Sequence, residues 1–106
     1  MFDAMLDDIT VLDLTTFVTG GFATTMLANQ GAEVIKIERP GGGDSNRDSY
    51  PERGGMGFEF MSRYRNKKSV VVDLKDEDGR QLAEDMISGV DVLVENFAPG
   101  VMDRLG

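Results

Sequence analysis

Residues 31–44 read GAEVIKIERPGGGD, and this stretch decides the fold that we expect for the whole chain. Its apolar part, from Ala32 to Glu38, predicts a strand, and Gly31 before it suits the end of a preceding helix. The strand leads through Glu38 and Arg39 into a loop of three consecutive glycines. Open α/β sheets bind ligands at the carboxyl ends of their strands, so the stretch predicts a site for an anionic, nucleotide-like ligand.

The elements predicted on both sides of this stretch alternate between strand and helix. Short runs of Val, Ile and Leu predict strands at residues 9–14, 69–74 and 90–94. Helices are predicted at 22–30, at 56–64, after a cap at Asp76, and after Pro99-Gly100, and residues 40–55 are predicted to form an irregular loop. The order β-α-β-loop-β-α-β predicts an α/β fold with a Rossmann-like parallel sheet.

The first predicted helix follows Gly20-Gly21 and is expected to pack through an apolar face. The residues at helical spacing on that face are Phe22, Ala23, Met26 and Leu27. The two glycines either close a tight turn, which we favour, or let backbone amides face a phosphate at the helix N-terminus. The GxGxxG pattern of dinucleotide-binding folds is absent here, which weakens the case for a dinucleotide.

Composition limits the function classes that the chain can serve. A chain of 106 residues is one domain or part of one. Cys and His are both absent, which excludes disulfides, a histidine base and thiolate or imidazole metal sites, and we predict no metal. The net charge of −8 disfavours nucleic-acid binding, although residues 36–68 carry eight bases against five acids. No apolar run is long enough for a membrane helix and no signal peptide is evident, so a cytoplasmic protein is expected.

Charged residues near two predicted strands are candidates for ligand contact. Glu38 and Arg39 follow a strand where dinucleotide folds place ribose-reading residues, and the alternative is that they are surface charges. A second group is the basic run at residues 63–68, which contains Arg63, Arg65 and Lys67 and indicates either solvated surface or an anionic cofactor. No catalytic unit can be assembled, because the chain has no His, no Cys and no convincing pair of carboxylates.

Taken together, the motifs resemble those of the class III CoA-transferases. The motifs, in order, are VLDLT (11–15), GAEVIKIERP (31–40), GGGDSNR (41–47), RNKKSVVVDLK (65–75), DGR (78–80) and ENFAPGVMDRLG (95–106). That family includes formyl-CoA transferase and the related α-methylacyl-CoA racemases. The resemblance covers essentially the whole chain, with two departures: Gly21 stands where many members have proline, and Lys68 where arginine is usual.

The resemblance implies a set of coenzyme A contacts and no catalytic residue. It places a loop against CoA, an arginine near the adenine, an apolar contact, two residues beside the pantetheine arm and an arginine near a phosphate. The loop is Thr16, Phe17, Val18 and Thr19, the arginine near the adenine is Arg39, and the apolar contact is Val72. The residues beside the pantetheine arm are Asn96 and Phe97, and the arginine near a phosphate is Arg104. The catalytic aspartate of the family's transferases is expected beyond Gly106.

The resemblance also implies how the chain would function. Residues 1–106 would form an incomplete, N-terminal CoA-binding segment of a cytoplasmic transferase that acts on an acyl-CoA and a carboxylic acid. The full-length protein would be an interlocked homodimer, without nucleic-acid or membrane partners. Two alternatives stay open: the racemase branch, which exchanges an α-proton of an acyl-CoA, and a non-catalytic CoA-binding module. The 106-residue chain alone is predicted to be inactive.

Overall fold

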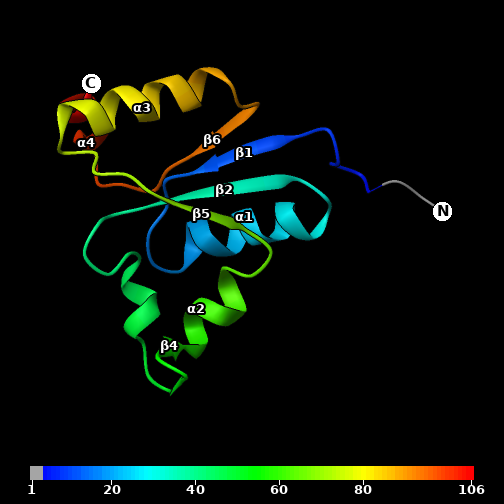
Figure 1. Ribbon diagram of the computed structural model, residues 1–106. Coiled ribbons are helices and arrows are strands. Elements are labelled where there is room, and N and C mark those ends of the chain that lie inside the picture. The colour runs from blue at the N-terminus through cyan, green and yellow to red at the C-terminus, as the bar shows by residue number, and fades with distance from the viewer. Residues whose placement is uncertain (1–3) are drawn as a thin grey trace.

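The computed structural model describes residues 4–106 and contains a four-stranded sheet. Its strands are β1 (Thr10–Asp13), β2 (Glu33–Glu38), β5 (Lys68–Val71) and β6 (Val92–Val94), and their order is β5-β2-β1-β6 (Figure 1). All neighbouring pairs are parallel. The predicted α/β fold with a Rossmann-like parallel sheet is therefore confirmed.

The parallel pairing brings the carboxyl ends of all four strands to one edge of the sheet. Asp13 pairs with Lys36 between β1 and β2, and Glu38 pairs with Val71 between β2 and β5. The chain builds outward from β1 to β2 and β5, then returns to place β6 on the other side of β1. Such a reversal of strand order is where open α/β sheets form a ligand crevice.

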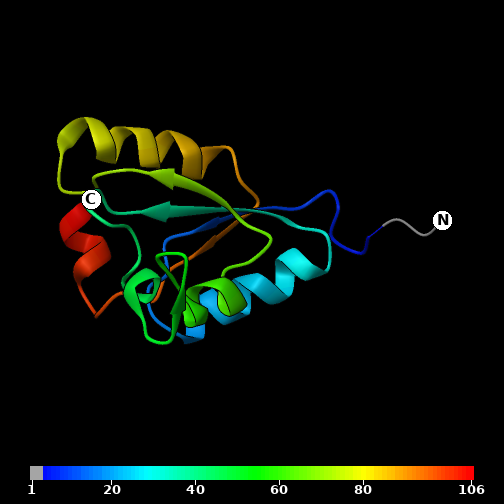
Figure 2. The ribbon, with the colours of Figure 1, turned by 60° about the horizontal axis from the view of Figure 1, so that its bottom comes forward.

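Helices cover both faces of the sheet. Helices α1 (Thr19–Asn29) and α2 (Phe58–Arg63) lie on one side, and α3 (Glu77–Ser88) and α4 (Val101–Leu105) lie on the other (Figures 1 and 2). Alternate residues of the central strands enter two cores, because successive side chains of a strand point to opposite faces. The core under α1 contains Val11, Ala28, Ala32 and Val34; that under α3 contains Leu12, Leu14, Ile37, Val72 and Ala83.

Helix α1 differs from its prediction in both its start and its buried face. It begins at Thr19, so Gly20 and Gly21 belong to its first turn and do not form a separate tight turn. The predicted apolar face is wrong, because Phe22, Ala23 and Met26 are exposed. The buried residues of α1 are Gly20, Gly21, Thr24, Thr25 and Ala28. This small, hydroxyl-bearing face is needed because the adjoining end of the sheet carries buried charges.

The segment between β2 and β5 has more structure than the predicted loop. It contains a 3₁₀ helix, η1 (Ser45–Asp48), and a hairpin of β3 (Glu52–Arg53) with β4 (Met56–Gly57) before α2 begins. Strand β5 then covers Lys68–Val71, earlier than the predicted 69–74, and β6 begins at Val92. Within residues 4–106, none of the helices has the length and apolar character needed to span a membrane.

Candidate functional site

A cavity of about 310 Å³ opens at the carboxyl edge of the sheet. Its walls are residues 14–17 after β1, 37–39 and 43–45 around the end of β2, 72–75 after β5, and Phe97 after β6. A volume of this size is within the range of small-molecule sites, which favour such strand ends in open α/β folds.

Five of the nine predicted CoA contacts line this cavity. They are Thr16, Phe17, Arg39, Val72 and Phe97. The structure thus brings together residues that lie up to 81 positions apart in the sequence, from Thr16 to Phe97. The other four, Val18, Thr19, Asn96 and Arg104, are not part of the cavity wall.

Those four residues occupy different places around the site. Val18 is the N-cap of α1 and Thr19 is its first residue, and both are exposed. Arg104 is exposed on α4. Asn96 is hydrogen-bonded to Thr16, which lines the cavity. Its Nδ2 donates to the Thr16 carbonyl at 2.7 Å, and its Oδ1 accepts from the Thr16 N–H at 2.9 Å.

Arg39 is exposed beside the cavity and retains free hydrogen-bonding capacity. Its Nε donates to the Gly43 carbonyl at 2.9 Å, and no other hydrogen bond or ion pair of Arg39 is found within residues 4–106. The terminal nitrogens of its guanidinium are therefore available for an anionic group. Lys75 is a second cation in the cavity wall, which the sequence did not single out.

Glu38 is neither a surface charge nor free to bind a ribose. Its carboxylate accepts two hydrogen bonds from Arg47, at 2.7 and 2.6 Å, one from the Asp44 amide at 2.8 Å and one from Ser69. Burial raises the pKa of Glu38, but the bonds from Arg47, Ser69 and Asp44 outweigh it and lower the pKa to about 2. Glu38 therefore anchors the loop that follows β2.

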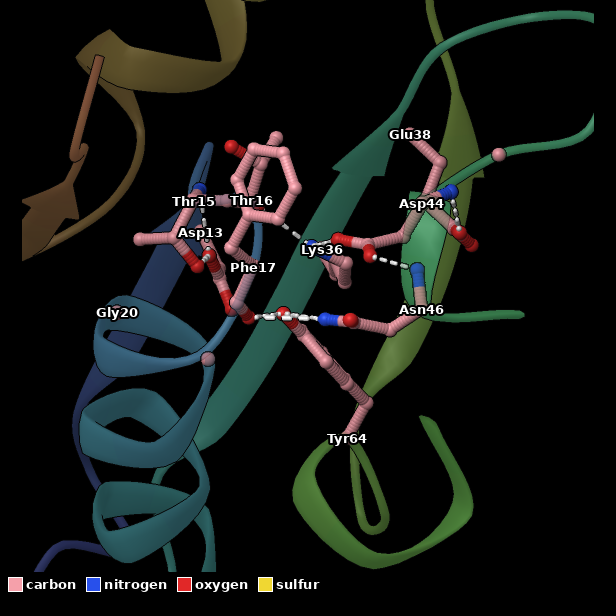
Figure 3. Close-up of polar contacts among 12 residues, drawn as sticks. Asp13, Thr15, Thr16, Phe17, Gly20, Lys36, Glu38, Asp44, Asn46 and Tyr64 are labelled. Atoms are coloured by element: carbon pink, nitrogen blue, oxygen red, sulfur yellow. Dashed lines mark hydrogen bonds and ion pairs between the residues drawn. The ribbon is translucent and has the colours of Figure 1, made fainter. Parts of the chain in front are cut away.

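A network of buried charges lies next to the cavity, on the α1 side of the sheet, and Figure 3 shows its members Asp13, Lys36 and Asp44. Lys67 contacts Asp13 Oδ2 at 2.9 Å and also donates to Thr24 at 2.6 Å, and its side chain is 2% exposed. Lys36 pairs with Asp44 at 3.0 Å and donates to the Thr15 carbonyl at 2.7 Å. The expectation that the basic run at 63–68 is solvated or binds a cofactor is thus wrong for Lys67.

The environment of this network shifts the pKa values of its members. Burial lowers the pKa of Lys67. For Asp13 burial raises the pKa, but hydrogen bonds from Thr15 and Thr24 together with the nearby lysines produce a net lowering. The two charges cancel within each of the pairs Lys36–Asp44 and Lys67–Asp13. None of these four side chains therefore leaves an uncompensated charge in the interior.

Tyr64 contacts one lysine from each of the two ion pairs. The ammonium groups of Lys36 and Lys67 are each 4.5 Å from the centre of its ring. Burial raises the pKa of the Tyr64 phenol to about 12, so the hydroxyl remains a hydrogen-bond donor at neutral pH. It donates to the Phe17 carbonyl, which also accepts from Asn46 at 3.0 Å (Figure 3).

The sequence contains a partial signal for this network. Asp13 follows Val11, and Lys36 follows Val34, by two positions, so each charge shares the inward face of an apolar residue. A charge on a buried strand face requires a partner. The alternation of side chains along a strand could therefore have identified Asp13 and Lys36 as charges that need one. Lys67 offered no such signal, because it belongs to a run of basic residues outside any predicted strand.

No group of three or more Asp or Glu able to hold a metal ion is found within residues 4–106.

The model of CoA-transferase family III matches residues 6–106. The chain belongs to this family. Over 100 residues it is 48% identical to the acetyl-CoA:oxalate CoA-transferase of Acetobacter aceti, an alignment that covers 94% of this chain and 26% of that protein. It is 42% identical over 102 residues to the human succinyl-CoA:glutarate CoA-transferase, covering 95% of this chain and 23% of the relative.

Solved structures of similar proteins share the fold of this CoA-transferase family III chain. A CAIB/BAIF family protein from Brucella suis superposes with a TM-score of 0.90 at 31% identity, over 98% of this chain and 29% of that one. A hypothetical protein from Mycobacterium tuberculosis gives a TM-score of 0.89 at 39% identity, over 98% and 28%. The chain thus spans about a quarter of the length of the curated relatives it matches.

Proposed function

We propose that these residues are the CoA-binding part of a CoA-transferase that moves CoA between an acyl-CoA and a carboxylic acid. The observation that carries this proposal is the strand-end cavity lined by Arg39, whose guanidinium has no ion-pair partner among residues 4–106, in a chain that belongs to CoA-transferase family III. The relatives named above act on acyl-CoA and carboxylate pairs, which supports the same substrate classes here.

The chemistry of the cavity wall fits the parts of coenzyme A. Its apolar side chains, among them Val72 and Phe97, suit the largely uncharged pantetheine arm. Arg39 and Lys75 supply cations for phosphate oxygens, and the planar guanidinium of Arg39 can also stack on an adenine ring. Glu38 is paired with Arg47, and Asp44 is paired with Lys36. These two carboxylates therefore repel an anionic ligand less than unpaired carboxylates would.

Bond making and breaking in this proposal belongs to an aspartate outside these residues. Its carboxylate would attack the thioester carbonyl of the acyl-CoA and release the CoA thiolate, forming a mixed anhydride. The thiolate would then attack the aspartyl carbonyl, release the first acid and leave an aspartyl-CoA thioester, which the second acid resolves by the reverse steps. Residues 4–106 would bind and orient CoA, in a cytoplasmic protein that acts as an interlocked homodimer.

The racemase branch is the alternative within the same family. The relatives reported above are transferases at 42–48% identity, and this favours CoA transfer. Incubating the intact protein with an acyl-CoA in deuterated water, with no acceptor acid, separates the two. A transferase leaves the α-position unlabelled under these conditions, whereas incorporation of α-deuterium would establish the racemase.

Removal of the Arg39 guanidinium tests the proposed binding site. We expect Arg39→Ala to raise the dissociation constant for CoA by about 10-fold or more, because a hydrogen bond to a charged group contributes about 1.5–3 kcal/mol. The measurement is calorimetric titration of CoA into the intact protein. Arg53→Ala is the matched control, since Arg53 is exposed on the β3–β4 hairpin and absent from the cavity wall. Equal affinities of both variants and the unaltered protein would refute the role of Arg39.

A further inference from the structure

The backbone of residues 15–17, which forms one wall of the cavity, is held by side chains that come mostly from distant parts of the chain. The Thr15 N–H donates to Asp13 and its carbonyl accepts from Lys36. Both backbone groups of Thr16 are bonded to Asn96. The Phe17 carbonyl accepts from Tyr64 and Asn46. Five of the six backbone polar groups of this short segment are thereby fixed without any regular secondary structure.

Phe17 needs this support because its backbone conformation is unfavourable. Its φ angle is +61°, in the left-handed region that bulky side chains rarely adopt. Burial does not explain the conformation, since the Phe17 side chain is 62% exposed. Strained backbone of this kind persists where surrounding contacts enforce it, and it is concentrated at ligand sites. Two hydrogen bonds to the Phe17 carbonyl fix the peptide plane that follows this residue.

Both donors to that carbonyl are themselves rigidly held. The Tyr64 ring contacts the ammonium groups of Lys36 and Lys67 and stacks on Phe60, with ring centres 5.0 Å apart. Asn46 belongs to η1, and its N–H donates to the cap residue Asp44 at 2.8 Å. Its side-chain nitrogen also lies 3.1 Å from the Tyr64 hydroxyl, so the two donors form one unit around the carbonyl (Figure 3).

We propose that Tyr64 and Asn46 are positioning residues that hold Phe17 in its left-handed conformation and so place its side chain against the bound acyl-CoA. The direction of a side chain follows from the φ and ψ angles of its residue, so relaxation of Phe17 to an ordinary conformation would redirect its ring away from the cavity. Neither positioning residue is in the cavity wall, and both act only through Phe17. The inference rests on the proposed CoA-binding function.

Tyr64→Phe tests the inference with minimal disturbance. The variant keeps the ring, its stacking on Phe60 and its contacts with both lysines, and removes only the hydroxyl that donates to Phe17. The matched control is Tyr50→Phe, because Tyr50 is 89% exposed. We expect Tyr64→Phe to raise the dissociation constant for CoA by about 3- to 10-fold, the effect of losing one hydrogen bond, and Tyr50→Phe to leave it unchanged.

A second measurement reports on the backbone without CoA. The NMR Cα chemical shift and HN–Hα coupling of Phe17 distinguish left-handed from ordinary backbone, and we expect them to change in Tyr64→Phe and in Asn46→Asp. Asn46→Asp replaces the donor by an acceptor of the same size. Unfolding midpoints are recorded alongside, because a purely structural role would lower the midpoint and leave the CoA affinity of the folded fraction intact.

The outcomes separate this inference from the proposed function. Absence of saturable CoA binding by the unaltered protein would overturn the proposed function and with it the purpose of the contact. An unchanged Phe17 backbone in both variants would overturn the positioning role, whether or not CoA binds. A changed Phe17 backbone with unchanged CoA affinity would show that the contact serves folding only, and this too would overturn the inference.

Discussion

Lys67 and Asp13 form an ion pair in which the two side chains are 2% and 0% exposed. Removing two charges from water is costly, and the pair offsets this cost through additional bonds. Lys67 also donates to Thr24 and the Gly21 carbonyl, and Asp13 accepts from Thr15 and Thr24. Such a pair adds little net stability compared with apolar residues in its place, but breaking it leaves a buried charge without its partner.

At this scale we expect Lys67→Met to lower the free energy of unfolding by about 3–5 kcal/mol, because Asp13 is left charged and unpaired in the interior. Lys68→Met is the neighbouring control: the Lys68 side chain is 71% exposed in its pair with Glu33, and such pairs contribute about 0–1 kcal/mol. Both values come from equilibrium denaturation with urea. The double variant Asp13→Asn, Lys67→Met should recover part of the loss, and similar values for the two single lysine variants would contradict the buried pairing.

Among the elements, helix α3 is positioned by close backbone contact at its first turn. Asp76 caps the helix by accepting from the amides of Asp78 and Gly79, as its place before two acidic residues predicted. Gly79 lies so close to the preceding loop that a Cβ built on it would be 1.9 Å from the Asp73 carbonyl oxygen. That loop carries Asp73 and Lys75 into the cavity wall, so the contact links the helix to the candidate site.

At the element scale, helix propensity and packing predict opposite effects for Gly79→Ala. Alanine in a helix is favoured over glycine by about 1 kcal/mol. We nevertheless expect the variant to lose about 1–3 kcal/mol of unfolding free energy, because the new methyl group must displace backbone. Gly89→Ala is the control, since a Cβ at Gly89, the C-cap of α3, would make contacts of only 3.7 Å or longer. A more stable Gly79→Ala protein would show that the loop moves freely.

The elements also show where pattern reading fails. The apolar spacing of Phe22 and Met26 indicated the buried face of α1, yet these side chains are 56% and 49% exposed. Periodicity reports which residues share a face but not which face meets the sheet. In this protein Asp13 and Lys67 determine which face of α1 is buried, because both are hydrogen-bonded to the hydroxyl of Thr24, which must therefore face inward.

For the whole molecule, the described residues form a sheet with a cavity at its carboxyl edge but contain no catalytic unit. The sheet has β5 and β6 at its edges, and the outward-facing Val71 and Val92 are 62% and 37% exposed. Exposed strand edges favour association with further chain or with another molecule. This arrangement agrees with the proposal that the segment serves CoA binding within a larger assembly, and it carries a prediction about the chain taken alone.

We expect the purified 106-residue chain to show no CoA transfer above the uncatalysed rate, because the proposed nucleophilic aspartate lies outside it. The assay mixes the chain with succinyl-CoA and oxalate and follows the CoA esters by liquid chromatography. The acetyl-CoA:oxalate CoA-transferase of Acetobacter aceti, assayed with acetyl-CoA and oxalate, serves as the positive control. Turnover that scales with the concentration of the 106-residue chain would contradict the proposal that catalysis requires an aspartate outside these residues.

The sequence by itself determined the α/β alternation, the parallel sheet and the strand ends at which Arg39, Val72 and Phe97 gather, because these follow from local periodicity, from chain order and from family motifs. Only the tertiary structure decided what the remaining polar residues do. Glu38 bonds Arg47, Lys67 bonds Asp13, and Tyr64 with Asn46 holds Phe17 in its strained conformation. Each of these contacts joins residues at least nine positions apart, and some join residues more than 40 apart. Local pattern shows that such a charge or hydroxyl exists, but its burial and its partner are set by how distant segments pack together.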